Sequence, residues 1–331
     1  MAGRRTPDRP PEPVQPVGRG VARAVSIPAR LVQILVTLLA LSCVFYLLLG
    51  LMPGDPIDLA LTLDPRLTPA DVERLRALHG LDRPLWARYL AWAGAVLRGD
   101  FGYSRLFAQP VFALVGPALW SSLQLLGAAL GLAVLVGVGL GMLAALRPRL
   151  SPLVQGLAAI AQAMPGFWLG ILLIILFAVT LGMLPAGGVA EAGEPGWRFL
   201  VLPVATLGFG HMAAYARHAL SAMRGAMTDP WIRSARARGA SEGRIALAHA
   251  LPNAAVPLIT LLGLDAGALV SGAVITETLF ARPGMGKLIF DAVMGNDYNL
   301  ALVALLLVAG VTMLGNLAAD LAQRALDPRL A

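Results

Sequence analysis

The stretch Asp229–Asn253, with the sequence DPWIRSARARGASEGRIALAHALPN, decides how the rest of the chain is interpreted. It contains four arginines and lies between two long apolar segments. Asp229 is a residue type that caps helix N-termini, and Pro230 suits the first helical position. Gly239 stands where a left-handed C-terminal cap is expected. These features predict a short basic helix that ends at a glycine turn.

A second short helix is expected directly after that turn. Ser241 is a residue type that starts helices, and Pro252 is expected to end the segment. The result is a basic helix-turn-helix between two apolar segments. Because a free loop needs no such helical signals, we interpret it as a docking surface.

The composition places the chain in a membrane. The 331 residues are 57% hydrophobic and only 14% charged, whereas about a quarter of the residues of a soluble domain are charged. A net charge of +7 would suit nucleic acid, but the excess arginines lie in a few loops, where they orient a chain in a bilayer. We therefore expect membrane lipid and no nucleic acid as a partner. The single cysteine, Cys43, excludes a disulfide framework.

Six apolar segments are long enough to cross a bilayer, which takes about 20 residues. They cover approximately residues 31–52, 119–146, 153–183, 199–219, 254–276 and 300–321. The expected fold class is therefore all-α, with six transmembrane helices. Five glycines in the second segment predict close helix packing: Gly127, Gly131, Gly137, Gly139 and Gly141.

Loop charges predict the orientation. The loop at 147–149 and the loop at 228–253 are basic, whereas the loop at 184–199 is not. Since basic loops stay inside, both termini and the helix-turn-helix are expected in the cytoplasm. Residues 1–28 are rich in Pro and Arg and are expected to form a disordered cytoplasmic tail. The run after Arg30 is too long for a signal-peptide core, so we expect it to remain as an anchor.

The segment 53–116 is then extracytoplasmic and is expected to be helical. One helix is predicted from Thr68-Pro69 to Gly80, and another from Pro84 to Gly99. The aromatic residues of the second helix fit an interfacial helix, and they also fit a surface for an extracytoplasmic partner. Both interpretations stay open.

Asp265 interrupts the fifth apolar segment. A carboxylate at the centre of a span costs at least about 2.5 kcal/mol, so this side chain should face a cavity or a partner. It either makes a polar contact to another subunit's helix, or is a protonated acid, or lines a translocation path that favours cationic substrate ends.

Motifs for other chemistry are incomplete. Gly284-Met285-Gly286-Lys287 is similar to a phosphate-binding loop, but Ala281 and Leu288 stand where that motif needs Gly and Ser or Thr. His211 and His218 share a helix face without a third ligand. We therefore expect no catalytic residue, no metal site, no bound cofactor and no enzymatic activity in this chain.

The spacing of the helix-turn-helix resembles the short cytoplasmic loop of ABC-importer permeases, whose core is Glu-Ala-Ala, three residues, Gly and, after nine more, Ile-x-Leu-Pro. The two blocks here read Arg233-Ser234-Ala235-Arg236-Ala237-Arg238-Gly239 and His249-Ala250-Leu251-Pro252. Arg233 and Ser234 replace the first Glu and Ala, and His249 replaces the Ile. The chain resembles the dipeptide/oligopeptide/nickel branch of that family. Further matching motifs are Pro53-Gly54-Asp55-Pro56, Arg98–Gly102, Pro165–Gly170, Glu277–Gly286 and Leu326–Arg329.

The resemblance implies the type I ABC importer permease fold over residues 29–331. It implies a heterodimer with a second, homologous permease, two ABC ATPase subunits that hold ATP and Mg, and an extracytoplasmic solute-binding protein. The 228–253 loop would carry the coupling helix, with Asp229 and residues 233–239 as its ATPase contacts. The alternative is a secondary transporter driven by an ion gradient. Relatives carry dipeptides, longer peptides, nickel complexes and some sugars, and di- or oligopeptides are the substrates expected here.

Overall fold

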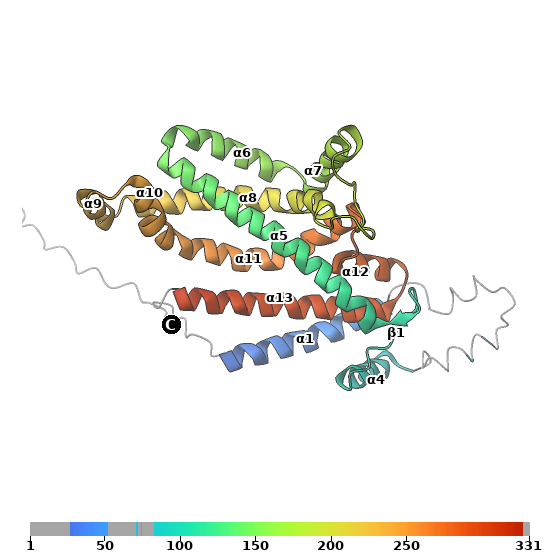
Figure 1. Cartoon of the computed structure of the whole chain (residues 1–331). Coiled ribbons are helices and arrows are strands. Elements are labelled where there is room, and N and C mark those ends of the chain that lie inside the picture. The colour runs from blue at the N-terminus through green and yellow to red at the C-terminus, as the bar shows by residue number, and fades with distance from the viewer. Residues whose placement is uncertain (1–26, 52–70, 72–73, 75–82, 327–331) are drawn as a thin grey trace, which may run out of the picture.

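The structure, a computed structural model, describes residues 27–51, 71, 74 and 83–326, and these are mainly helical (Figure 1). In chain order the elements are α1 (Ile27–Gly50), α4 (Leu85–Leu97), β1 (Tyr103–Ser104), β2 (Gln109–Pro110), α5 (Val111–Leu146), a 3-10 turn (Pro148–Leu150), α6 (Ser151–Ala163), α7 (Gly166–Leu173), a π-helical segment (Ile174–Thr180), α8 (Arg198–Met227), α9 (Pro230–Ala237), α10 (Glu242–Arg244), a second π-helical segment (Ile245–Ala250), α11 (Leu251–Leu279), α12 (Met285–Met294) and α13 (Tyr298–Leu326). The all-α prediction is confirmed, apart from one antiparallel pair of two-residue strands.

Four of the described helices are each long and apolar enough to cross a membrane, namely α1, α5, α8 and α13. Two further spans are possible if each of two bent helix pairs crosses as one unit, which gives up to six. The structure therefore supports a multi-pass protein, and the count of six stays a prediction.

The third apolar segment, 153–183, is not one straight helix. The chain bends by 99° between the helical stretches Pro148–Ala163 and Gly166–Thr180. Met164 is extended, with φ −85° and ψ 123°, because the proline that follows disfavours helical geometry there. Pro165 then serves as the N-cap residue of α7.

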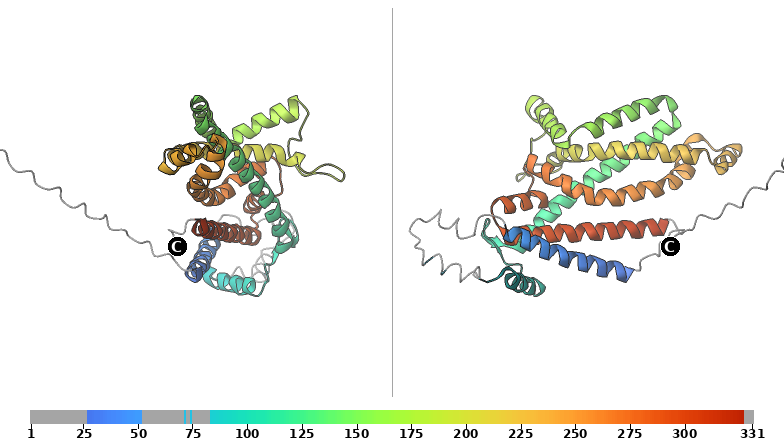
Figure 2. Two further views of the ribbon diagram at one scale, coloured as in Figure 1. Left: turned by 60° about the vertical axis from the view of Figure 1, so that its left-hand side comes forward. Right: turned by 180° about the vertical axis from the view of Figure 1, so that it is seen from behind.

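The long helices lie side by side in the order α6, α8, α11, α13 and α1, and α5 crosses them obliquely (Figures 1 and 2). The most extensive packing joins α5 and α8. On α5, a Cβ added at Gly137 would lie 2.5 Å from the Met212 carbonyl oxygen, and one at Gly141 would lie 2.5 Å from that of Ala216. The predicted packing role is therefore confirmed for these two glycines. The other three, Gly127, Gly131 and Gly139, face no described atom within 4 Å.

The bundle has two distinct ends. The start of α1, the end of α13 and α9 lie at one end, which we call the α9 end (Figure 1). An ion pair of 3.3 Å between Arg30 and Asp320 joins the two terminal helices there. The β1–β2 hairpin, α4 and α12 lie at the opposite end, which we call the hairpin end. Both described termini of the helical region are thus on the same side as the basic helix.

Hydrogen bonds accepted by buried Asp297 fix the hairpin end. Its Oδ2 accepts bonds from Ser104 Oγ at 2.5 Å and from the Leu106 amide at 3.0 Å. Its Oδ1 accepts a bond from the Leu300 amide at 3.2 Å, in the first turn of α13. One carboxylate therefore connects the hairpin to the last long helix.

The helix predicted from Pro84 is confirmed as α4, which ends at Leu97, and Gly99, with a φ of +84°, follows its C-cap residue. The Tyr89 hydroxyl lies 2.8 Å from Ser42 Oγ of α1, and Trp92 Nε1 donates to Asn299 of α13. The helix predicted over 68–80 and the tail at 1–28 fall almost entirely outside the described residues.

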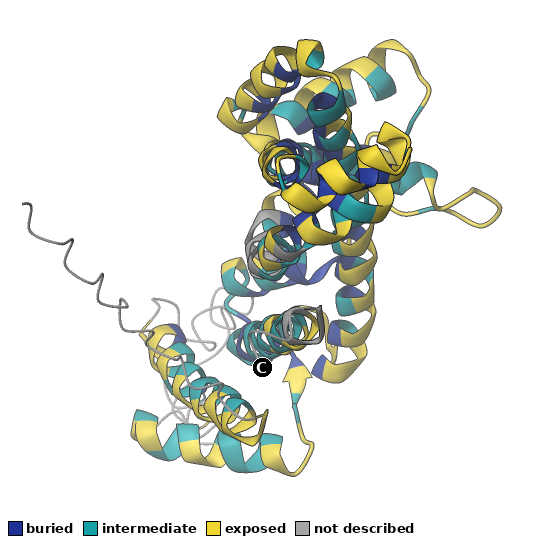
Figure 3. Cartoon of the chain, turned by 90° about the vertical axis from the view of Figure 1, so that its left-hand side faces the viewer, coloured by how far each residue is buried: buried dark blue, intermediate teal, exposed yellow. Residues whose placement is uncertain are grey.

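Large apolar side chains are exposed on α1 and α6 (Figure 3). On α1, Val32 is 60% and Leu35 69% exposed, and on α6, Leu157 is 57% exposed. Apolar surface of this extent suits lipid or a partner subunit.

Candidate functional site

The basic helix α9 begins and ends where the sequence predicts. Asp229 is its N-cap residue, with an extended backbone, although the side chain makes no capping hydrogen bond. Gly239 has a φ of +83°, the left-handed geometry expected of a helix C-terminus. Ser241 caps the next helical turn by accepting a bond from the Arg244 amide at 3.4 Å.

Pro252 does not end the second helix, so that prediction is wrong. The chain runs from α10 through the π-helical segment Ile245–Ala250 directly into α11. Pro252 occupies one of the first two positions of α11, directly after the π-helical segment. The helix-turn-helix is therefore continuous with the next long helix.

One side of α9 is packed into the protein. Ile232 is fully buried and Ala235 is 2% exposed. They contact a cluster from α8, the π-helical segment and the start of α11: Met223, Ala226, Ile245, Ala246, Ala250 and Ala254. Ala235 was predicted among the ATPase contacts, and in this structure its small side chain packs α9 against its own chain.

The other side of α9 forms an exposed face, which we call the α9 face. Its exposed residues are Arg233, Ser234, Arg236, Ala237, Arg238 and Gly239. Arg236 makes a bidentate ion pair with Glu242, with Nε–Oε1 at 2.7 Å and Nη2–Oε2 at 3.0 Å. Within the described chain, Arg233 and Arg238 have no carboxylate in ion-pair reach, so they carry the available charge of this face.

Glu242 was not among the residues singled out from the sequence. The two hydrogen bonds from Arg236 lower the pKa of its carboxyl group. The pair closes the turn around Gly239 and joins α9 to α10. A glutamate three residues after a glycine cap was the signal available in the sequence.

Asp265 faces two polar side chains of α8. Its Oδ2 lies 3.3 Å from Nδ1 of His211, and the Tyr215 hydroxyl lies beside the same carboxylate. The Asp265 side chain is 13% exposed and that of His211 24%. His211 and Tyr215 are four residues apart, so they share one helix face. The sequence drew attention to His211 only as a metal ligand, and no group of three potential metal ligands occurs among the described residues.

The segment similar to a phosphate loop has a structural role. Glu277, at the end of α11, is fully buried, and its Oε2 accepts bonds from the amides of Gly286 and Lys287 at 2.8 and 3.1 Å. Its Oε1 accepts a bond from Ser122 Oγ at 2.5 Å. The N-terminus of α12, which would attract an anion, therefore already holds a carboxylate of the same chain.

A bundle of apolar helices with an exposed basic helix at one end defines a polytopic α-helical membrane protein. The pattern of the family described as "Binding-protein-dependent transport system inner membrane component" matches residues 137–331. Together with the relatives below, this match shows that the chain belongs to that family, as the resemblance in the sequence indicated.

Similar proteins cover nearly the whole chain. A putative peptide permease protein of Brucella ovis is 36% identical over 88% of this chain and 94% of its own length. The oligopeptide transport system permease protein AppB of Bacillus subtilis is 34% identical over 88% and 95%. The dipeptide transport system permease protein DppB of Escherichia coli K12 is 31% identical over 91% and 97%.

Among solved structures, the MetNI methionine ABC transporter in its inward-facing conformation contains a similar chain. The TM-score is 0.55 at 20% identity, over 66% of this chain and 98% of that one. At this identity the likeness concerns the fold. It is the fold of an ABC-importer membrane subunit, so the fold expected from the sequence is supported.

Proposed function

We propose that this chain is one transmembrane subunit of an ATP-driven importer of di- or oligopeptides. It pairs with a second, homologous permease, receives peptide from an extracytoplasmic binding protein, and is driven by two ATPase subunits in the cytoplasm. The chain itself is not an enzyme, because ATP and Mg are bound and used by those ATPases. The similar proteins named above are peptide, oligopeptide and dipeptide permeases, which supports the substrate class.

The proposal depends on one observation, the packing of one side of α9 and the exposure of the other. Its inner side is packed into the chain through Ile232 and Ala235, while its outer face is exposed and basic. A helix that is firmly attached on one side and free on the other suits a partner that pushes on it.

The connections of α9 determine which helices move with it. α9 lies between the end of α8 and the continuous helical path into α11, and the cluster that holds Ile232 includes residues of both helices. ATP-driven closure of a partner subunit on α9 therefore moves α8 and α11 together and changes which side of the membrane the pathway faces.

The contact residues of this coupling helix are Asp229 and the α9 face, with Arg233 and Arg238 making charge-assisted bonds to the ATPase. Ala237 and Gly239 allow the ATPase to approach α9 closely, whereas Ala235 contributes by packing α9 into its own chain. In this arrangement the α9 end is cytoplasmic, both termini are cytoplasmic, the hairpin end faces outward, and the permease domain spans 29–331.

Asp265 is proposed to line the translocation path. It lies midway along α11 and faces His211 of α8, so it is positioned between the two helices that the coupling helix moves. A positively charged peptide end or side chain competes with His211 for this carboxylate.

The experiment that tests the coupling role replaces Gly239 with valine. A β-branched residue strongly disfavours a φ of +83°, although the position is sterically open. Membrane insertion should persist, whereas ATP-dependent peptide uptake in proteoliposomes with the partner subunits should fall by about tenfold or more, and ATPase activity should uncouple or detach.

The matched control is Gly243→Val, at a glycine four residues away in a helix, where an added Cβ has no described neighbour within 4 Å beyond its own helix backbone and φ is not positive. That variant should transport normally. Full uptake by the Gly239→Val transporter would refute the docking role. Uptake that needs an ion gradient and no ATP would favour the secondary-transporter alternative.

A further inference from the structure

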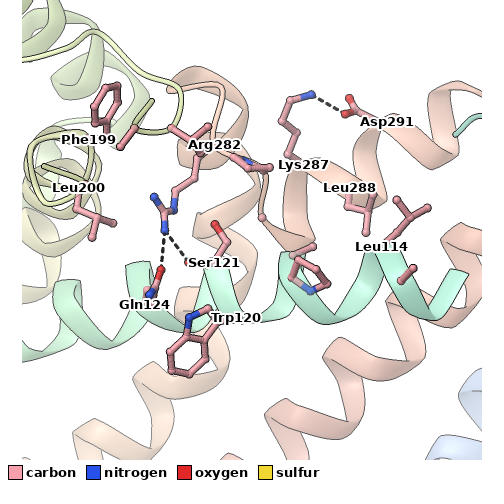
Figure 4. Close-up of a pocket in the computed structure, with 18 of the residues that line it drawn as sticks. Leu114, Trp120, Ser121, Gln124, Phe199, Leu200, Arg282, Lys287, Leu288 and Asp291 are labelled. Atoms are coloured by element: carbon pink, nitrogen blue, oxygen red, sulfur yellow. Dashed lines mark hydrogen bonds and ion pairs between the residues drawn. The ribbon is translucent and has the colours of Figure 1, made fainter. Parts of the chain in front are cut away.

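A cavity of about 940 Å³ lies at the hairpin end, apart from α9 and from Asp265 (Figure 4). Its walls come from the first half of α5, the loop that precedes α8, and the start of α12. Most of the lining is apolar and includes the rings of Trp120, Trp197 and Phe199. Its volume is typical of a pocket for a small organic ligand.

The cavity contains one buried cation, Arg282, which is only 7% exposed. Its Nη2 donates to the Ser121 carbonyl oxygen at 3.3 Å and to Gln124 Oε1 at 3.2 Å, and both acceptors are uncharged (Figure 4). Its Nε has no hydrogen-bond partner within the described residues. A buried guanidinium with an unused donor is costly unless something else binds it.

Nearby carboxylates are engaged elsewhere. Asp291 pairs with Lys287 at 2.5 Å, so these two lining residues neutralise each other. Glu277 lends Arg282 long-range stabilisation, but its oxygens are bonded to Ser122 and to the α12 amides. Across the described chain no carboxylate lies within ion-pair distance of Arg282, so its guanidinium makes no direct ion pair and its Nε stays unbonded.

The walls around this charge are held in place. The Gly188 amide donates to the Phe280 carbonyl oxygen at 2.7 Å, which ties the loop before α8 to the α11–α12 corner. The Met285 amide donates to Ser122 Oγ at 2.8 Å, which ties the start of α12 to α5. Arg282 is therefore presented in one orientation, and binding needs little further ordering.

We propose that this cavity binds a short peptide by its C-terminal carboxylate, with Arg282 as the anchoring cation and the aromatic wall holding the last side chain. The proposal rests on the proposed function and adds an outward-facing site within this subunit. Arginine suits a carboxylate because its planar donors match the two oxygens.

The test uses the assembled transporter in nanodiscs of neutral lipid, without the binding protein. The probes are the dipeptide Ala-Phe and the same dipeptide with a C-terminal amide, and the readout is the dissociation constant of each. Wild type should bind the acid about tenfold or more tighter than the amide, because a charge-assisted bond is lost with the amide. Arg282→Gln should remove this preference, and Arg282→Lys should keep part of it.

A matched control and a second variant distinguish loss of the binding site from misfolding of the protein. Arg105→Gln removes an exposed cation at the same end of the molecule that does not line the cavity, and the preference should persist. Gln124→Glu leaves Arg282 in place but gives it a carboxylate partner, so affinity for the acid should fall by about tenfold while the amide is less affected.

Three results would overturn the proposal. The first is a wild-type transporter that does not distinguish acid from amide, and the second is an Arg282→Gln transporter that still does. The third is loss of the preference in nanodiscs containing phosphatidylglycerol, with Arg282-dependent retention of that lipid, which would assign the site to a lipid phosphate. ATP-driven peptide uptake by the wild-type transporter is a separate measurement. Failure of this site and failure of the proposed function can therefore be told apart.

Discussion

Glu277 illustrates at the residue scale how one side chain determines local structure. A helix N-terminus preceded by glycines is a general anion site, and here the anion is a carboxylate from the preceding helix. The sequence predicted that Gly284–Lys287 is not a nucleotide loop. It could not predict the partner, because Ser122 and Glu277 meet only when α5 and α11 pack together, 155 positions apart.

Gly284→Ala should destabilise the protein. A Cβ at this position would lie 2.2 Å from the Glu277 carboxyl group, so the carboxylate must leave the amides of α12. We expect a loss of about 2 kcal/mol in the free energy of unfolding, typical of hydrogen bonds to a charged group. The measurement is thermal unfolding in detergent. Gly225→Ala, in a helix with no described atom within 4 Å, is the control and should be neutral or slightly stabilising.

Asp265→Asn should change substrate preference without changing assembly. If the carboxylate lines the path, uptake of peptides with Lys or Arg side chains should fall several-fold relative to neutral peptides, because the charge that attracts them is removed. Competition uptake in proteoliposomes measures the ratio. Asp320→Asn, which removes a carboxylate at the α9 end, should leave the ratio unchanged. An unaltered ratio in Asp265→Asn would exclude a role in the path.

At the scale of elements, the prolines show where sequence rules succeed and where tertiary structure decides. Pro84 and Pro230 stand at helix starts, as predicted. Pro165 breaks a segment that apolar length alone predicted as one span, because hydropathy does not register a single extended residue. Pro252 was expected to end a helix and lies near a helix start instead, since the preceding π-helical segment shifts the hydrogen-bond register.

The Arg236–Glu242 pair predicts a pH dependence of the helix-turn-helix. The pKa of Glu242 in the folded protein lies below its ordinary value of 4.5, so the stabilisation is complete above that value and is lost as the pH falls through the lowered pKa. In Glu242→Gln at pH 7, the amides of residues 236–242 should exchange hydrogen about two- to fivefold faster than in wild type, as for loss of an exposed ion pair.

The comparison with wild type should change with acidity. As the pH falls below 4.5, protonation of Glu242 removes the pair from wild type as well, and the difference in exchange should shrink. Glu191→Gln, in the loop before α8, should match wild type throughout. Equal exchange in Glu242→Gln and wild type at pH 7 would mean that the pair does not hold the turn.

At the scale of the whole molecule, the most extensive helix–helix contact is the packing of α5 against α8. Composition and apolar length predicted a membrane-spanning helical bundle, and the glycines on α5 predicted a close contact. Which glycines make it could not be predicted, because the rotation of α5 about its axis depends on its partner. Gly137 and Gly141, four residues apart, face α8, and Gly139 between them does not.

Gly141→Val should separate these two helices. Its Cβ would lie 2.5 Å from the Ala216 carbonyl oxygen and 2.7 Å from the Ala219 Cβ, which are rigid neighbours. We expect about 3 kcal/mol of destabilisation, at the upper end of ordinary overpacking, and a lower yield of folded protein by size-exclusion chromatography. Gly139→Val adds the same volume where no described atom lies within 4 Å and should keep the wild-type yield. Equal yields for both variants would contradict the packing role.

The length and slant of α5 have a mechanical consequence. Its 36 residues form a rod of about 54 Å. Its first turns hold Ser121 and Gln124 beside Arg282, and its last turns rest on α8 close to where α9 begins. Because one helix contacts both regions, a displacement of α5 at one end also changes its position at the other end. Under the two proposals above, a ligand bound beside Arg282 and a movement of α9 would therefore act on opposite ends of the same helix, and each would oppose or assist the other.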